Sequence, residues 1–279
     1  MIAIKAYIQL TKPGIIMGNA LTAFAGFVLA SKGGYDIQIL ALTLLGLSLV
    51  MAGGCIANNC FDKEADAKMA RTQGRPLVKG SVSLVGAKRY AFILASCGLI
   101  LLFIYTNLFA TAAAFVGLVV YVLIYTPMKY QSVHATLIGS IAGATPPVVG
   151  YLAVTGRLDW GAFLLFAFLV FWQMPHFYAI ALYRQEDYKA ASVPVLPLVV
   201  GLQTTKRVMQ AYLAAFVVSA GILGVFFHLQ PLYWITMTVL CGGWLLFASI
   251  CKNQSFARGM FIISLVVITL FTLLLPFCL

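Results

Sequence analysis

Nine long apolar runs occupy most of this chain and decide what it can fold into. They fall at about residues 14–31, 37–60, 90–106, 108–126, 133–155, 160–183, 208–228, 231–250 and 258–277. A helix that crosses a bilayer needs roughly 20 apolar residues. Only 9% of the 279 residues are charged, against about 25% in soluble proteins. We therefore predict an all-α, polytopic membrane protein with one membrane domain over residues 1–279, and we exclude a soluble enzyme and a disordered chain.

The fifth run carries two pairs of residues that predict how its helix is built. Pro146 and Pro147 predict a kink, because proline removes a backbone donor and clashes with the preceding turn. Gly139 and Gly143 have the small-xxx-small spacing that lets membrane helices pack closely. This run is therefore expected to form a kinked helix with a close neighbour.

The basic residues are sorted to one side of the nine-span map. The N-terminus and the loops after the second, fourth, sixth and eighth spans share a side, and 16 of the 18 lysines and arginines fall there. They are Lys5, Lys12, Lys63, Lys68, Arg71, Arg75, Lys79, Lys88, Arg89, Lys129, Arg184, Lys189, Lys206, Arg207, Lys252 and Arg258. Only Lys32 and Arg157 fall on the other side. The positive-inside rule then predicts a cytoplasmic N-terminus and an external C-terminus.

The same bias accounts for the formal net charge of +11, which on a soluble protein would suggest a nucleic-acid partner. The six cysteines show no metal-binding spacing, and we interpret them as small hydrophobic residues. The N-terminus has neither a signal-peptide cleavage pattern nor an Arg- and Ser-rich transit sequence. We expect a multi-pass protein of a bacterial cytoplasmic (inner) membrane that binds no nucleic acid.

Two cytoplasmic loops, at about 61–89 and 184–207, combine carboxylates with bases. Their acids are Asp62, Glu64, Asp66, Glu186 and Asp187. Asp36 and Asp159 are the only acids on the external side, where the loops are short and nearly uncharged. We therefore expect the polar chemistry of the protein to face the cytoplasm.

Asn58, Asp62 and Asp66 begin the first of these loops at a spacing of four residues. On a helix this spacing forms one polar stripe about two turns long. Two acids on one face repel each other, and a hard divalent cation relieves that repulsion. Mg²⁺ typically takes one or two carboxylates together with substrate phosphates. The stripe indicates either a metal site or a solvated helix end.

Three bases follow within nine residues, at Arg71, Arg75 and Lys79. Gly74 and Gly80 allow unusual backbone angles between them. Such a loop suits a phosphate group, because arginine can make bidentate contacts with phosphate oxygens. The alternative is a positive-inside loop that contacts lipid headgroups. Carboxylates and bases side by side favour a metal–diphosphate site.

Two shorter motifs end the sixth and fourth spans. In the first, Asp187 follows Tyr183 by four residues and supplies a third carboxylate. In the second, Lys129 follows Tyr125 by four residues. The alternative for Lys129 is a simple anchor at the membrane interface. Neither motif is specific by itself.

Together the four motifs resemble those of the UbiA-type intramembrane prenyltransferases. The matched positions are Asn58, Asp62 and Asp66 in N-x-x-x-D-x-x-x-D, and Tyr125 and Lys129 in Y-x-x-x-K. The second acidic motif of that superfamily, D-x-x-x-D, is matched only in part, because Tyr183 stands where the first acid would be. This departure argues against a symmetrical arrangement of two Mg²⁺ sites and against the quinone-pathway members.

Longer stretches resemble the branch of that superfamily that farnesylates protohaem IX. They lie at 11–14, 71–80, 139–150 and 172–197, and the resemblance runs from about residue 6 to about 207. The last three spans resemble the family mainly in hydropathy. The resemblance implies nine helices around a central cavity that opens to the cytoplasmic side. It also implies transfer of farnesyl from farnesyl diphosphate to a vinyl group of haem b, with water addition, giving haem O.

The resemblance further implies which residues and partners take part. The catalytic, Mg²⁺-holding set would be Asn58, Asp62, Asp66 and Asp187. The diphosphate-binding set would be Arg71, Arg75, Lys79, Tyr125, Lys129 and Arg184. Haem b is implied as a substrate rather than a cofactor. The implied partners are farnesyl diphosphate, haem b and membrane lipids, with a haem A synthase or a terminal-oxidase assembly pathway downstream.

Three histidines are present, and two of them are candidates for contacts with haem. His176 lies inside the sixth span, where polar residues usually face the bundle and serve function. We hypothesise that it contacts the haem iron or a propionate; the alternative is a hydrogen bond to a neighbouring helix. His134 lies near the cytoplasmic end of the fifth span and is a second candidate. His228 is predicted to lie outside.

Three other functions remain open on the sequence. A quinone or chlorophyll prenyltransferase would share the diphosphate site but not the histidine-bearing sixth span. A membrane transporter would place charges or broken helices near mid-membrane and would be revealed by solute flux. A haem-binding assembly factor without catalysis would not need Asp62 or Asp66.

Overall fold

The computed structural model describes residues 2–34, 36–251 and 255–279, and all the regular structure in these ranges is helical. Nine helices in this part of the chain are long and apolar enough to cross a membrane. They are α2 (Pro13–Ser31), α3 (Ile37–Lys68), α4 (Leu84–Tyr105), the α5–η1–α6 span (Leu108–Met128), the α7–α8 span (Ala135–Thr155), α9 (Trp160–Tyr183), α11 (Leu196–Phe226), α12 (Pro231–Ile250) and α13 with η2 (Phe256–Phe277). The predicted all-α fold with nine spans is confirmed.

The helices are longer at the charged end than the apolar runs predict. α3 continues to Lys68, because the polar residues after Phe61 include good helix formers and no glycine or proline. α4 begins at Leu84, where the Ser83 side chain accepts a hydrogen bond from the Gly86 amide at 3.0 Å. The first predicted loop therefore narrows to residues 69–83. The second contains α10 (Gln185–Ala190), and α11 already begins at residue 196.

The kink predicted in the fifth span is confirmed. The span consists of α7 (Ala135–Gly143) and α8 (Thr145–Thr155), which meet at Ala144. Pro146 and Pro147 lie in the first turn of α8, where a missing backbone donor costs nothing. Gly143 packs closely, because a Cβ there would lie 1.9 Å from Oε1 of Gln173 on α9. A Cβ on Gly139 would lie 2.9 Å from the Tyr125 ring.

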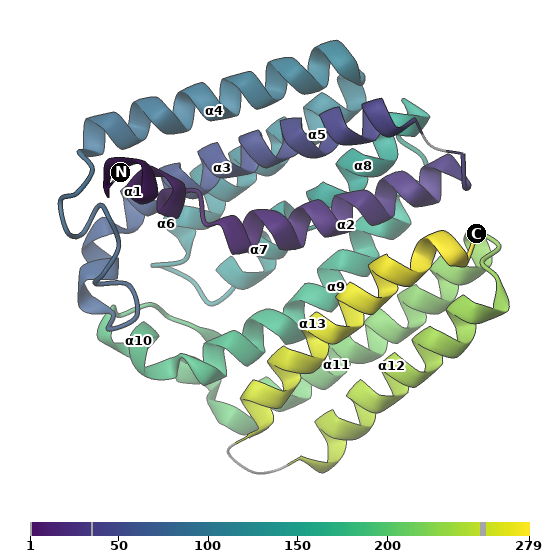
Figure 1. Ribbon diagram of the computed structural model, residues 1–279. Coiled ribbons are helices and arrows are strands. Elements are labelled where there is room, and N and C mark those ends of the chain that lie inside the picture. The colour runs from purple at the N-terminus through teal and green to yellow at the C-terminus, as the bar shows by residue number, and fades with distance from the viewer. Residues whose placement is uncertain (1, 35, 252–254) are drawn as a thin grey trace.

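Close backbone contacts and aromatic packing hold the bundle around α9. α2 and α8 touch at two glycines, since a Cβ on Gly26 or Gly150 would lie 1.9 Å from a carbonyl oxygen of the other helix. Phe168 of α9 packs between Phe216 of α11 and Phe271 of α13, with ring centroids 4.8 Å apart in each case. Figure 1 shows α9 between the α2–α8 side and the α11–α13 side, with the N- and C-termini at opposite ends.

Most of the predicted cytoplasmic bases lie at the end of the bundle that holds the N-terminus. A short helix, α1 (Ile2–Leu10), precedes α2 there, and the end of α3, the 69–83 loop and α10 lie at the same end (Figure 1). Lys252, one of the predicted cytoplasmic bases, lies outside the described residues. Nine apolar helices and this distribution of charge make the chain a multi-pass membrane protein.

Candidate functional site

The predicted polar stripe on α3 lies inside the protein. Asn58, Asp62 and Asp66 are only 3%, 5% and 2% exposed, whereas Phe61 and Lys63 between them are exposed. The four-residue spacing places all three on the face of α3 that packs into the bundle. The stripe is therefore not a solvated helix end, and each buried polar group needs a partner.

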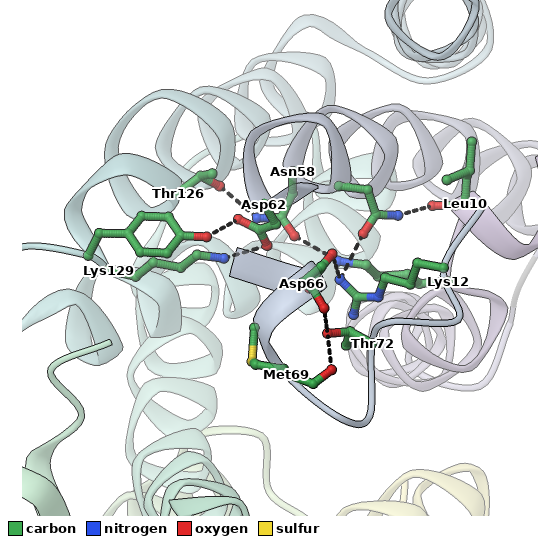
Figure 2. A network of polar contacts seen from close by, with 12 residues as sticks. Leu10, Lys12, Asn58, Asp62, Asp66, Met69, Thr72, Thr126 and Lys129 are labelled. Atoms are coloured by element: carbon green, nitrogen blue, oxygen red, sulfur yellow. Dashed lines mark hydrogen bonds and ion pairs between the residues drawn. The ribbon is translucent and has the colours of Figure 1, made fainter. Parts of the chain in front are cut away.

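Asp62 is held by two residues that follow the fourth span. Nζ of Lys129 lies 2.5 Å from one carboxylate oxygen, and the Tyr130 hydroxyl donates to the other at 2.7 Å. Figure 2 shows the Lys129 side chain reaching Asp62 from one side of the α3 helix. Burial, together with the negative charge of Asp62, raises the pKa of Tyr130 far above its ordinary value near 10. The phenol therefore remains a donor to Asp62 at neutral pH.

Asp66 is held by the basic loop that follows it. Nη1 of Arg75 lies 2.5 Å from the Asp66 carboxylate and 3.2 Å from Oδ1 of Asn59. Asn59 in turn donates to the Leu10 carbonyl at 2.9 Å, and the Thr72 hydroxyl donates to the Asp66 carbonyl at 2.9 Å. The loop thus folds back over the end of α3 and ties it to α1 (Figure 2).

Asn58 is held by Lys12, which the sequence had not singled out as a site residue. Nζ of Lys12 donates to Oδ1 of Asn58 at 2.7 Å, and the Asn58 amide donates to the Thr126 hydroxyl at 3.0 Å. Burial lowers the pKa of Lys12 to about 8. The backbone of Lys12 has φ +56, a left-handed conformation that costs a non-glycine residue roughly 1–2 kcal/mol. The sequence signals for Lys12 were its position before Pro13 and its place in the 11–14 stretch that carries the resemblance.

A basic hollow opens beside this network. It is a cavity of about 310 Å³ lined by Gln9, Lys12, Asn59, Arg71, Gly74, Arg75 and Pro76. Asp187 reaches its edge, because one carboxylate oxygen lies 3.8 Å from Nε of Arg71. The side chain of Arg71 is 42% exposed, so this pair is much looser than those of Asp62 and Asp66. The hollow therefore presents bases to a ligand, with carboxylates directly behind them.

The remaining predicted site residues lie at different distances from this network. Tyr125 lies close, since its ring stacks on Tyr121 at 5.7 Å and Nζ of Lys129 lies 5.8 Å from its centre. Three others form no hydrogen bond or ion pair with these carboxylates in the described part of the chain: Lys79, Arg184 and His134. Lys79 and His134 are exposed, and the Arg184 guanidinium lies over the Tyr183 ring at 4.7 Å.

The oxygen donors of the α3 stripe suit a divalent metal only together with a ligand. No group of three or more His, Cys, Asp or Glu side chains converges among the described residues. The two buried acids and the Asn58 amide on one helix face are instead the sparse set of oxygen donors that Mg²⁺ uses when phosphate oxygens complete its shell. The residues therefore fit Mg²⁺ bound together with a phosphorylated ligand.

A second polar cluster lies deeper in the bundle, on α9. His176 is 9% exposed, and its Nδ1 lies 2.7 Å from the Ser264 hydroxyl of α13. The hydrogen bond to a neighbouring helix, which the sequence left as an alternative, is therefore present. His228 lies at an exposed turn after α11.

The sequence matches one known protein family and is similar to named members of it. The model of the UbiA prenyltransferase family matches residues 19–265. The chain is similar to the protoheme IX farnesyltransferase of Protochlamydia amoebophila, with 46% identity over 98% of each chain. It is also similar to protoheme IX farnesyltransferase 2 of Chromobacterium violaceum, with 44% identity over 95% of this chain and 90% of that one.

Solved structures share the fold at low sequence identity. A digeranylgeranylglyceryl phosphate synthase superposes with a TM-score of 0.82 at 18% identity, over 100% of this chain and 99% of that one. A UbiA homologue from Archaeoglobus fulgidus, bound to DMAPP and Mg²⁺, gives a TM-score of 0.71 at 16% identity, over 98% and 99%. These likenesses extend over essentially the whole of each chain.

Proposed function

The chain belongs to the UbiA prenyltransferase family, and we propose that it transfers farnesyl from farnesyl diphosphate to a vinyl group of haem b, with addition of water, giving haem O. Two findings support this function. The relatives named protoheme IX farnesyltransferase are 41–46% identical over nearly the whole chain. The observation that carries the chemistry is the buried row of acids on α3, each paired with a base, of which Arg75 lines the basic hollow.

The basic hollow is the proposed diphosphate site. Three bases contact the polar side chains of α3: Lys12 at Asn58, Arg75 at Asp66 and Lys129 at Asp62. A fourth base, Arg71, lies near Asp187. On binding substrate, these bases exchange a carboxylate or amide partner for phosphate oxygens, for which arginine supplies bidentate contacts. The loop glycine Gly74 leaves the wall of the hollow open, since nothing lies within 4 Å of where its Cβ would be.

The charge of the site supports a requirement for Mg²⁺. The four bases Lys12, Arg71, Arg75 and Lys129 outnumber the three carboxylates Asp62, Asp66 and Asp187 by one. One net positive charge is too little for a diphosphate, and a divalent cation makes up the difference. Asn58, Asp62, Asp66 and Asp187 would hold Mg²⁺ against the diphosphate. When bound, the ion supplies electrostatic stabilisation of the leaving oxygen.

The chain's own residues then assist the transfer. The bond between the farnesyl C1 and the diphosphate oxygen breaks, and the bases take up the charge that develops on that oxygen. An allylic cation remains, and its C1 forms a carbon–carbon bond with the haem vinyl group. Water adds to the other vinyl carbon and loses a proton to solvent. The stacked Tyr121 and Tyr125 rings next to Lys129 offer aromatic faces that stabilise a cation by about 0.5–2 kcal/mol each.

Haem is proposed to lie between this site and α9. His176 would bind the haem iron, because it is the one of the three histidines that is buried, and it lies within a span. His134 is exposed at the start of α7 and would meet a propionate at the membrane surface. The basic residues support an N-terminus in the cytoplasm and a C-terminus outside, in a bacterial inner membrane.

Mass spectrometry of extracted haem tests this function. Membranes that contain the protein receive haem b, farnesyl diphosphate and Mg²⁺, and we expect a haem heavier by farnesyl plus water. Asp62→Ala should abolish the product, whereas Glu64→Gln is the matched control, since Glu64 is an exposed carboxylate on the same helix. Unchanged haem b in a folded preparation would contradict the proposal and direct the assay to quinone and chlorophyll-type acceptors.

A further inference from the structure

One hydroxyl group joins the sixth and ninth spans at the candidate haem residue. Ser264 of α13 is fully buried, and its Oγ lies 2.7 Å from Nδ1 of His176 on α9. The Ser264 carbonyl accepts a second hydrogen bond, from Nε1 of Trp172, at 3.0 Å. Because Trp172 lies one turn before His176, Ser264 fixes this face of α9 at two points.

The hydrogen bonds of Ser264 decide which nitrogen of His176 carries the proton. Its Oγ lies 2.6 Å from the carbonyl oxygen of Phe261, one turn earlier in α13. A carbonyl has no hydrogen to give, so the single hydroxyl hydrogen of Ser264 lies in that contact. The same hydroxyl must therefore accept from Nδ1 of His176. His176 is then the Nδ1–H tautomer, and its Nε2 carries a lone pair.

Nε2 of His176 is available to a ligand. Among the described residues it forms no hydrogen bond. Nδ1 is taken up by Ser264 of α13, so Nε2 is the ring nitrogen left without a protein partner in the described part of the chain.

The surroundings of the imidazole favour a metal ligand over a base. The ring stacks on Trp172 at 4.9 Å and packs against Phe261 at 5.2 Å and Phe177 at 5.6 Å. No described acid or base forms a hydrogen bond or an ion pair with it. A base that accepts a proton would become a buried cation without a counter-charge, which is costly. An iron ligand stays neutral, and a fixed second nitrogen is what orients such ligands.

We propose that Ser264 is a positioning residue that holds His176 in the Nδ1–H tautomer and so presents Nε2 to the iron of the haem substrate. This inference rests on the proposed function, because it needs haem as the acceptor. It makes the ninth span part of the haem site, although none of the motifs found in the sequence lies in that span. The role of Ser264 comes only from its contacts across 88 residues of sequence.

A haem titration of the purified full-length protein tests this role. Haem b is added to protein in detergent, and absorption and electron paramagnetic resonance spectra follow the iron. We expect an imidazole-ligated spectrum that His176→Ala abolishes and free imidazole restores. Ser264→Ala should weaken haem binding roughly 10-fold, as loss of a ligand-orienting partner does, and should alter the spectrum. Ser264→Thr keeps the hydroxyl and should resemble the unchanged protein.

Ser219→Ala is the matched control. Ser219 is a buried serine of α11 whose hydroxyl donates to the Phe216 carbonyl one turn earlier, at 2.7 Å, and contacts no histidine. Its variant should bind haem normally. If Ser264→Ala does not fold, Ser264→Cys gives the same test, because a thiol is a poor acceptor for Nδ1–H.

The possible failures are distinguishable. An unaltered spectrum and affinity in folded Ser264→Ala or Ser264→Cys would overturn the positioning role and leave the farnesyl transfer intact. An imidazole spectrum that survives in His176→Ala would overturn the ligand role in the same way. If the unchanged protein neither binds haem nor yields a heavier haem by mass spectrometry, the proposed function itself fails and the inference falls with it.

Discussion

The two acidic motifs of this protein have the same four-residue spacing but very different structures. Asp62 and Asp66 lie on one continuous helix, buried, each within 2.5 Å of a base. Tyr183 and Asp187 are separated by a helix break at Arg184, where α9 ends and α10 begins. Asp187 has one loose partner at 3.8 Å. Equal spacing produces a common face only where the helix between the residues is unbroken.

This difference predicts that the two motifs contribute unequally to transition-state stabilisation. The α3 motif is rigid and enclosed before any ligand binds, and its bases are already in place. The α10 motif lies at the rim of the basic hollow and faces Arg71, a partly exposed base. Preorganised groups contribute more to a transition state than groups that must be ordered during the reaction. Substitutions in the α3 motif should therefore have the larger effects.

Asp62→Asn should have the largest effect. It removes a proposed metal ligand and leaves the partly buried Lys129 without a counter-charge. We expect kcat to fall about 10²–10³-fold and stability to fall by roughly 3 kcal/mol. The double variant Asp62→Asn, Lys129→Met should recover stability but not activity. Product formation by mass spectrometry and thermal unfolding in detergent measure the two effects. Activity retained within tenfold would contradict the catalytic role of Asp62.

The contacts of this motif mark the limit of what the sequence predicts. Helical periodicity was enough to place Asn58, Asp62 and Asp66 on one face, and hydropathy was enough to find the nine spans. The partners of that face lie far away in the chain: Lys12 is 46 residues from Asn58, and Tyr130 is 68 from Asp62. Such pairs depend on how whole helices pack, and no local pattern encodes them.

The basic loop shows the opposite case, in which residues close together in the sequence are separated in the structure. Three bases close together in sequence predicted a joint phosphate-binding role. Arg75 folds back onto Asp66, Arg71 faces Asp187, and Lys79 points to solvent, because the turns after Thr72 and Arg75 rotate successive side chains apart. Composition predicted a phosphate-binding site. The path of the loop decides that Arg71 and Arg75 line the basic hollow and that Lys79 does not.

Asp187→Asn should have an intermediate effect on activity and almost none on stability. A tenfold fall in kcat/KM, or about 1.4 kcal/mol of transition-state stabilisation, is expected if Asp187 helps to hold Mg²⁺. Stability should change by less than about 0.5 kcal/mol, since Arg71 is 42% exposed and the pair is long. The loss should shrink when the Mg²⁺ concentration is raised. A loss that does not depend on Mg²⁺ would mean that Asp187 acts in another way.

Tyr130→Phe should have a smaller effect within the rigid motif. The phenol donates to Asp62 at 2.7 Å, and a hydrogen bond to a charged group contributes about 1.5 kcal/mol or more to stability. We expect a loss of that size in thermal unfolding, with activity reduced less than tenfold, because Lys129 still holds the other carboxylate oxygen. Tyr7→Phe serves as control, because the Tyr7 ring pairs with Tyr90 and its hydroxyl forms no hydrogen bond with Asp62. A loss as large as that of Asp62→Asn would place the phenol itself in the reaction.

Tyr183→Asp should have the smallest effect, although it restores the complete D-x-x-x-D motif. The Tyr183 side chain is half exposed beneath the Arg184 guanidinium, and the break at Arg184 separates it from the face that carries Asp187. An acid at residue 183 would thus lie outside the basic hollow, and we expect activity and the Mg²⁺ requirement to change less than about twofold. Titration of activity against Mg²⁺ in both forms measures this. A clear rise in Mg²⁺ affinity would show that α9 and α10 straighten when substrate binds, and the two motifs would then be equivalent in the working enzyme.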